Sequence, residues 1–148
     1  MSKIGFAVAV FILSTQAGCD QRPSSGCLSG RSEALLTGNF SGPIVCSSED
    51  ATFVEIGTVG DYVLYDYRYR FMPEHGAVMH GGQKVVIFNG ARYVGQYALN
   101  PSPYATVGLK GSRVLFQTEG DPGVSVMEFA HGPPPQIFSG GHVSSLYR

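Results

Sequence analysis

From Ala51 onward the chain consists of short runs of valine, isoleucine, tyrosine and phenylalanine, which are separated by breaks that contain glycine. No run keeps apolar residues at the helical spacing of about 3.6 residues over ten or more positions, whereas several runs alternate as strands do. The pattern therefore predicts an all-β domain over residues 51–148. We expect strands near residues 52–57, 61–71, 77–80, 84–89, 92–99, 104–109, 113–118, 124–130, 136–138 and 142–147.

One segment, KVVIFNGARYVGQYAL (84–99), carries the strongest hairpin signal of the chain. Asn89 and Gly90 stand between two apolar runs, and both residue types tolerate the positive φ of a tight turn. The stretch FNGARYVGQ (88–96) is also similar to LKGSRVLFQ (109–117), which indicates consecutive hairpins of one design and hence an antiparallel meander. With about eight strands and no helix to cover a flat sheet, we expect the meander to close into a small barrel or to fold into a sandwich.

The stretch DYVLYDYRYRF (61–71) is the most distinctive of these expected strands. Side chains alternate across a strand, so this one should have an aromatic face and a charged face. The aromatic face carries Tyr65, Tyr67 and Tyr69, and the charged face carries Asp66, Arg68 and Arg70.

Two interpretations of this strand remain open. In the first, the aromatic face is core, and the charged face is solvated with a weak surface pair between Asp66 and Arg68. In the second, the tyrosines lie at a barrel mouth or an exposed groove, because each hydroxyl needs a hydrogen-bond partner. Such a surface would bind a sugar, a peptide or a partner protein. The predicted binding surface consists of Tyr65, Tyr67, Tyr69, Arg68 and Arg70.

The chain begins with MSKIGFAVAVFILSTQAGCD, which has the order of a bacterial export signal. One cation, Lys3, precedes an apolar run (4–13), and small and polar residues follow. Ten apolar residues are too few to span a bilayer, so a cleaved leader is expected rather than a membrane helix.

The end of this leader, QAGC (16–19), resembles the lipobox of bacterial lipoproteins. Ala17, Gly18 and Cys19 match that motif, whereas Gln16 stands where a branched aliphatic residue is usual. The resemblance implies that residues 1–18 are removed and that Cys19 carries a lipid, which would anchor a periplasm-facing protein to the membrane. The residues TQA before Gly18 also suit ordinary signal peptidase, which leaves a soluble secreted protein as the alternative.

Cysteine counting supports the lipid-anchored alternative. The chain has three cysteines, Cys19, Cys27 and Cys46, and an odd cysteine in an exported protein needs an explanation. If Cys19 carries the lipid, Cys27 and Cys46 remain as a pair, which an oxidising compartment would join in a disulfide.

Residues 19–50 are rich in serine, glycine and proline and show little periodicity. We expect a flexible tether followed by an N-terminal loop segment. Within this segment, SEALL (32–36) should form one helical turn, with Ser32 as its cap and Gly38 as its end.

Charge and motifs limit the function classes. Removing residues 1–18 removes Lys3 from the ten basic residues, so the eleven acidic residues slightly exceed the rest and nothing attracts nucleic acid. The chain has no nucleophile elbow, paired-cysteine motif, glycine-rich phosphate loop or zinc-protease helix, so we expect neither an enzyme nor a cofactor.

A weak metal signal lies in FMPEHGAVMHGG (71–82). Its candidate ligands are His75, Met79 and His80, because imidazole and thioether ligands suit copper. Their spacing does not force them together, so an ordinary hairpin loop is the favoured interpretation.

Together these features predict a small, non-enzymatic envelope lipoprotein whose β domain binds an envelope protein or a glycan. Two alternatives remain. NGARY (89–93) is similar to the conserved loop of small lipoprotein barrels that inhibit lysozymes, which implies a periplasmic hydrolase inhibitor. The candidate ligands in the 71–82 stretch would instead make the protein a periplasmic copper-binding protein.

Overall fold

The computed structural model describes residues 27–99, 104–120 and 122–148. The expected export leader, the lipobox and Cys19 lie outside these residues. The elements, in chain order, are the 3₁₀ turn η1 (Cys27–Gly30), α1 (Ser32–Thr37), β1 (Ala51–Val59), β2 (Tyr62–Phe71), β3 (His80–Asn89), β4 (Arg92–Leu99), β5 (Ala105–Lys110), β6 (Arg113–Thr118), β7 (Ser125–Glu128), β8 (Gln136–Ser139) and β9 (His142–Ser145). No helix among the described residues is long and apolar enough to cross a membrane.

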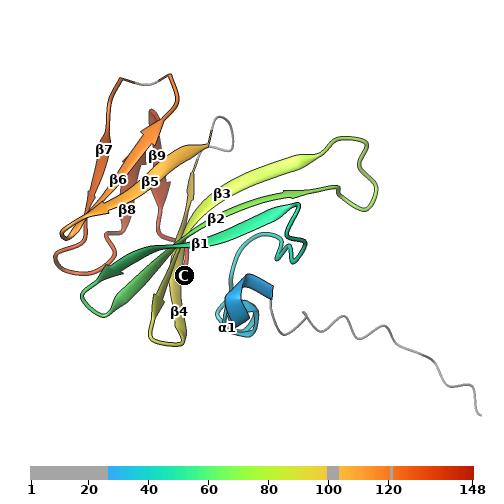
Figure 1. Cartoon of the computed structure of the whole chain (residues 1–148), viewed down its shortest axis with the longest axis horizontal. Helices are drawn as coiled ribbons and strands as arrows, with labels where there is room; N and C mark the ends of the chain where they lie inside the picture. Colours follow the sequence, from blue (N-terminus) through green and yellow to red (C-terminus); the bar gives the residue numbers. More distant parts are fainter. Residues whose placement is uncertain (1–26, 100–103, 121) are drawn as a thin grey trace, which may run out of the picture.

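The strands form three antiparallel sheets, which confirms the all-β prediction. The largest sheet is a meander with the order β1-β2-β3-β4, and β5-β6-β7 and β8-β9 form two smaller sheets. Figure 1 shows β5 to β9 grouped on one side of the large sheet and α1 on the other. The arrangement is sandwich-like, and the described strands do not close into a barrel.

The connection between β2 and β3 differs from the expectation. Residues 77–79 form no strand, and β3 begins only at His80, so the short strand expected at 77–80 is wrong. Pro73 accepts a backbone hydrogen bond from Gly76 at 2.9 Å, which closes a tight turn in place of a further strand. Both residue types favour turns over ladders.

The two hairpins of similar sequence are built alike. Asn89 pairs with Arg92 and Lys110 pairs with Arg113, so each hairpin has a two-residue turn that begins with glycine. Gly90 and Gly111 have φ values of 59° and 61°, and no positive φ occurs at the residue after either glycine. This combination suits a type II′ turn, in which only the first central residue needs positive φ. Asn89 is therefore the last strand residue, as the expected strand 84–89 has it, but it lacks the positive φ that the hairpin prediction allowed for it.

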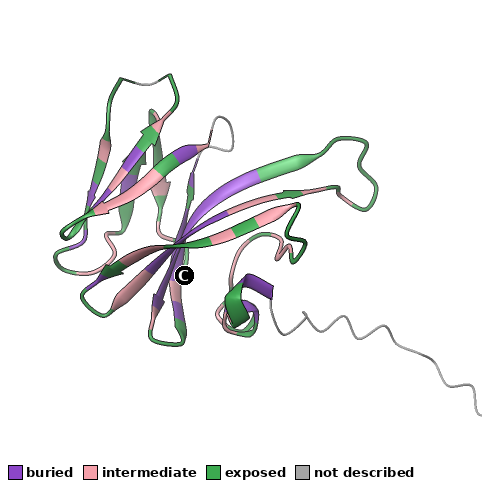
Figure 2. Cartoon of the chain, viewed as in Figure 1, coloured by how far each residue is buried: buried purple, intermediate pink, exposed green. Residues whose placement is uncertain are grey.

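The large sheet is covered on both faces. One face packs against the smaller sheets in a core that includes Leu64, Val85, Ile87, Tyr97, Val114, Phe116, Met127 and Ile137. The other face packs against residues 27–50 in a second core that includes Leu28, Leu35, Tyr65, Tyr67, Val86, Phe88 and Tyr93. Central strand β3 is consequently buried without interruption from Gly82 to Phe88 (Figure 2).

Residues 27–50, the described part of the segment before β1, pack into the core, and residues 19–26 of the expected tether lie outside the described residues. A disulfide joins Cys27 to Cys46, as expected, with 4.9 Å between their Cα atoms. Leu35 of α1 is completely buried against the sheet. β1 begins at Ala51, where the expected β domain begins, and the second core includes residues on both sides of that position.

The short helix α1 confirms the expected helical turn, with a different cap. Arg31 occupies the cap position without a capping side-chain hydrogen bond, and Ser32 is the first helical residue and is buried. Gly38 ends the helix by donating its N–H to the carbonyl oxygen of Ala34 at 3.0 Å. A Cβ atom at Gly38 would lie 2.6 Å from Cδ1 of Tyr93, so the helix end fits only without a side chain.

The disulfide should make a large contribution to stability. Replacing Cys27 and Cys46 together with serine should lower the free energy of unfolding by about 3 kcal/mol, because the cross-link restricts the unfolded chain. Urea unfolding of the oxidised wild type and the double variant measures the difference. Cys19→Ser is the matched control and should leave the unfolding midpoint unchanged; an equal loss in that variant would contradict the pairing.

Candidate functional site

The aromatic face of β2 is largely internal. Tyr65 and Tyr67 are 6% and 0% exposed, and Tyr69 is half-buried. The predicted binding surface is therefore wrong for Tyr65 and Tyr67, because residues 27–50 cover this face of the sheet. The weak sequence pattern of that covering segment gave no indication that it packs there.

The buried tyrosine hydroxyls find their partners within the chain. Tyr67 donates to the carbonyl oxygen of Pro43 at 3.1 Å and accepts the N–H of Val45 at 2.9 Å. Tyr65 donates to Glu55 at 3.3 Å and accepts from Arg31 at 3.1 Å. The hydroxyl groups of these rings thus bind the covering segment to the sheet. Their need for hydrogen-bond partners, which had favoured an exposed groove in the sequence analysis, is met inside the fold.

The opposite face of β2 holds a buried polar network rather than a solvated ion pair. Asp66 is only 9% exposed and receives hydrogen bonds from Arg68 at 2.9 Å and from Gln83 at 2.9 Å. Gln83 also donates to the carbonyl oxygen of Ala105 at 2.7 Å and accepts that residue's N–H at 2.8 Å. Arg68 donates to the same carbonyl oxygen at 3.1 Å. The network therefore joins β5 to the centre of the large sheet.

The remaining predicted surface residues line a groove at the end of β2. This groove, called the Arg70 groove below, has a volume of about 230 Å³ and is lined by Glu49, Asp50, Ala51, Thr52, Arg68, Tyr69, Arg70 and Tyr104. Arg70 donates through Nη2 to the carbonyl oxygen of Glu49 at 2.9 Å and to Asp50 at 3.4 Å. The guanidinium of Arg68 lies 5.6 Å from the ring centroid of Tyr104. Cations, carboxylates and an aromatic ring therefore meet at one edge of the fold.

Two adjacent glycines of β3 make room for tyrosines beside this groove. A Cβ atom at Gly81 would lie 2.9 Å from the hydroxyl of Tyr104, and one at Gly82 would lie 2.5 Å from the hydroxyl of Tyr69. Because neighbouring strand residues point to opposite faces, the two phenol groups rest on opposite sides of the same short stretch. Tyr104 and Gln83 were not predicted from the sequence. The two adjacent glycines could have indicated a close approach of tyrosine rings to this strand.

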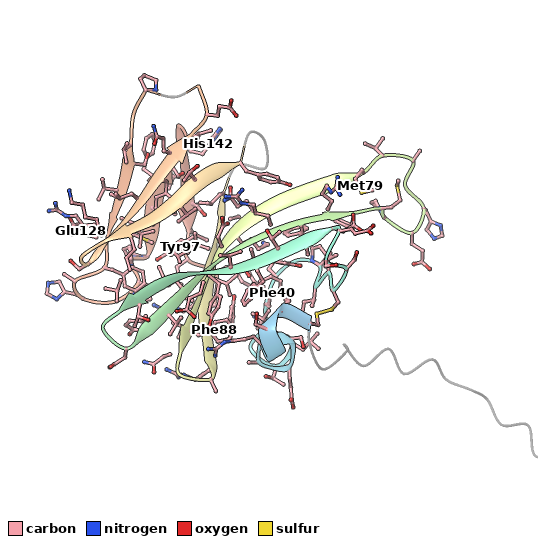
Figure 3. The ribbon with its side chains drawn as sticks, viewed as in Figure 1. Phe40, Met79, Phe88, Tyr97, Glu128 and His142 are labelled. Atoms are coloured by element: carbon pink, nitrogen blue, oxygen red, sulfur yellow. A yellow bond between two sulfur atoms is a disulfide. The ribbon has the colours of Figure 1, made fainter. Side chains whose placement is uncertain are left out.

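The candidate copper ligands lie at the far end of the β2–β3 hairpin. Met79 projects there in Figure 3, and both Met79 and His75 are exposed. His80 pairs with Phe71, and the two rings are 5.7 Å apart. Across the described ranges, no group of three or more histidine, cysteine, aspartate or glutamate residues is placed to hold a metal ion. No contact between His75, Met79 and His80 supports a copper site.

The NGARY stretch forms the tip of the β3–β4 hairpin. Gly90, Ala91 and Arg92 are exposed, whereas Tyr93 is only 7% exposed. Arg31 donates to the carbonyl oxygen of Gly90 at 2.7 Å and so ties this tip to the covering segment. A partner could therefore reach the turn itself but not the tyrosine that follows it.

Comparison with known proteins identified no relative of this chain. The chain matches no protein-family model. A search of curated proteins found no match, and a search of solved structures found none either. Functional inference therefore rests on the contacts within this chain.

Burial changes the acid–base behaviour of several tyrosines. Burial raises the pKa of Tyr67 to about 12, although the hydrogen bond from Val45 opposes this shift. Burial also raises the pKa values of Tyr93 and Tyr97. The Tyr93 hydroxyl has no hydrogen-bond partner among the described residues, and that of Tyr97 donates to the carbonyl oxygen of Pro134. All three rings are thus held neutral inside the fold.

This burial predicts a loss of stability in alkaline solution. Below pH 10 these tyrosines are protonated in both the folded and the unfolded chain, so their contribution to stability is complete. As the pH rises from 10 to about 12, the unfolded chain loses its phenol protons first, and the free energy of unfolding should fall. Each such tyrosine should contribute a slope of about 1.4 kcal/mol per pH unit.

Urea unfolding at about pH 9 and about pH 11.5, for the wild type and for Tyr67→Phe, measures this slope. The variant should be less stable at the lower pH, because it loses the bonds to Pro43 and Val45. It should also show a shallower decline with pH. Equal slopes in the two proteins would contradict the assignment to Tyr67.

Proposed function

We propose that this chain is a non-enzymatic, lipid-anchored binding module of the bacterial cell envelope. Its partner, an envelope protein or a glycan, would bind at the Arg70 groove. The observation that carries the proposal is the position of Arg68 and Arg70, the two predicted surface cations, which line one groove together with Tyr104.

The state of Arg70 supports a binding role. Its side chain is 56% exposed, and its two hydrogen bonds both use Nη2. Within the described part of the chain, Nε and Nη1 therefore remain for a partner's carboxylate, carbonyl or hydroxyl oxygen. Because Glu49 and Asp50 already restrict the guanidinium, less side-chain entropy is lost when a partner binds.

The aromatic component suits the same role. Arginine and tyrosine are among the residues that contribute most to protein interfaces, and tyrosine offers a flat apolar surface with a polar end. Tyr104 stacks near Arg68, which is itself fixed by Asp66 and Ala105. A rigid surface of this kind favours recognition by shape and hydrogen bonding over attraction by net charge.

A hydrolase inhibitor is the second candidate, favoured by the exposed tip of the β3–β4 hairpin. Gly90 and Ala91 form an exposed two-residue turn that the Arg31 hydrogen bond braces, and exposed Arg92 follows it as the first residue of β4. An inhibitor of this kind would insert the turn into the cleft of a lysozyme-type enzyme. Its binding would depend on Arg92 rather than on Arg70, which separates the two candidates by experiment.

The Arg70 groove is tested by capture of a partner from envelope extracts with the full chain, followed by titration of the captured partner. Arg70→Ala should weaken binding at least about tenfold, because arginine truncations at interface centres commonly cost that much. Arg113→Ala is the matched control, since Arg113 also forms an exposed ion pair, with Glu128, in the smaller sheet. Unchanged binding by Arg70→Ala would contradict the groove, and loss of binding by Arg92→Ala alone would favour the inhibitor.

The anchor is tested separately at Cys19, which lies outside the described residues. Cys19→Ser should move the protein from the membrane fraction to the soluble fraction and should remove the lipid mass from the mature N-terminus. The folded domain should remain intact, since Cys27 and Cys46 form their own disulfide. A Cys19→Ser variant that stays in the membrane fraction would contradict lipid anchoring.

A further inference from the structure

Lys84 is a buried cation without a counter-charge. Its residue is only 7% exposed, in the middle of central strand β3. Among the residues that the structure describes, its ammonium group forms no hydrogen bond and no ion pair, and its nitrogen lies over the ring of Phe40, 5.6 Å from the ring centroid. Burial of an unpaired charge is unfavourable, so a lysine at this position needs an explanation.

The covering segment holds the lysine stem in place. Gly42 approaches so closely that a Cβ atom there would lie 3.1 Å from Cε and 3.4 Å from Nζ of Lys84. Phe40, which lies between α1 and the sheet in Figure 3, borders the same side chain. Gly42 and Phe40 therefore enclose part of the lysine side chain.

A second unsatisfied polar group lies on the neighbouring strand. Gln96 is 2% exposed and donates through Nε2 to the carbonyl oxygen of Ser41 at 2.8 Å, but its Oε1 has no partner within the described ranges. Lys84 pairs with Ala98, and Gln96 pairs with Val86, so Lys84 and Gln96 are diagonal neighbours on one face. Diagonal neighbours have Cβ atoms roughly 7 Å apart.

Both groups line one pocket. It has a volume of about 350 Å³ and is bordered by Ser41, Lys84, Gln96, Ala98, Leu99, Ser139, His142, Val143, Ser144, Ser145 and Tyr147. The pocket thus lies where β3 and β4 meet the covering segment and the C-terminal β8–β9 hairpin. Its volume lies in the range of about 300–1,000 Å³ that is usual for small-molecule sites, and four of its lining residues are serines.

We propose that this pocket binds a small carboxylate that carries a hydroxyl or amino group near its acid group, such as a hydroxy acid, an amino acid or a sugar acid. The carboxylate would accept from Nζ of Lys84, and the ligand's O–H or N–H would donate to Oε1 of Gln96. Charge-assisted hydrogen bonds of this kind are strong where water is excluded. The serine side chains would supply further hydrogen bonds to a polyhydroxylated ligand.

The chemistry of the pocket favours this ligand class over two others. A neutral sugar would leave the buried ammonium uncompensated. A phosphate group carries roughly 1.5 to 2 negative charges near pH 7, which is more than one lysine balances. Burial lowers the pKa of Lys84, and a bound anion would reverse that effect by stabilising the charged form. This site is on the opposite face of the sheet from the polar network of Asp66 and does not depend on the Arg70 groove.

The test uses the full chain with sodium L-lactate, L-serine, sodium D-glycerate and sodium D-glucuronate as probes, and D-glucose and inorganic phosphate as controls. Isothermal titration and thermal unfolding should show that at least one carboxylate probe binds and raises Tm, whereas D-glucose has no effect. Lys84→Met should lose binding more than tenfold and should have a higher Tm than the wild type in ligand-free buffer. A buried lysine without a binding role would give the higher Tm in Lys84→Met but no response to any probe in the wild type.

Lys110→Met is the matched control, because Lys110 is the one other lysine of the described residues and is exposed at the end of β5. It should bind the probe as the wild type does. Acetate and lactate compared on Gln96→Met test the second contact, since this variant should lose the preference for lactate. Failure of all four carboxylates, stronger binding of phosphate, or equal binding by Lys84→Met and the wild type would each overturn the proposal.

Discussion

Coverage of the large sheet on both faces is the constraint on which the rest of the structure depends. β3 runs through the centre with both of its faces buried, so each neighbouring layer must supply apolar side chains to it. The smaller sheets do so on one face. On the other face residues 27–50 do so, and the Cys27–Cys46 disulfide and the hydroxyl of Tyr67 hold this segment in place. Without that segment a row of aromatic rings would be exposed to water.

The buried polar groups on the two faces of the large sheet differ in how fully they are hydrogen-bonded. On the face toward β5, Gln83 uses both ends of its amide, and Asp66 and Arg68 satisfy each other, so the network is complete. On the face toward the covering segment, the ammonium group of Lys84 forms no hydrogen bond or ion pair with the described residues, and Oε1 of Gln96 and the hydroxyl of Tyr93 have no partner among them either. Completed networks stabilise a fold, whereas unsatisfied buried groups cost stability and are commonly retained for binding or catalysis. This contrast separates the structural face from the candidate ligand site.

Much of the fold could be predicted from the sequence, because strand periodicity and turn residues are local signals. Gly90 and Gly111 marked two hairpins, and alternation along β2 separated Tyr67 from Arg68 correctly. Alternation says which residues share a face but not what covers that face. The burial of Tyr65 and Tyr67 depends on a segment of weak pattern, distant in sequence, whose position no local signal gives.

The candidate sites show the same division. Arg70 could be identified from a charged strand face, whereas its contact with Asp50 depends on how the chain enters β1. The face on which Lys84 lies could also be predicted, since alternation in KVVIF places it on the same face as Val86 and Phe88. The absence of a carboxylate near Lys84 among the described residues depends on how the segments pack together. Sequence alone could not distinguish it from a surface lysine at the end of a strand.

At Gly81 and Gly82 of β3 no side chain separates the two faces of the sheet, so tyrosine rings from both faces approach the backbone there. Tyr104 rests on Gly81 from one side, and Tyr69 rests on Gly82 from the other. Tyr69 also lines the Arg70 groove, and its hydroxyl borders Gly42, which in turn borders the stem of Lys84. One tyrosine side chain therefore stands between the groove and the lysine pocket, so a bulkier residue in place of Gly81 or Gly82 would crowd the surroundings of both.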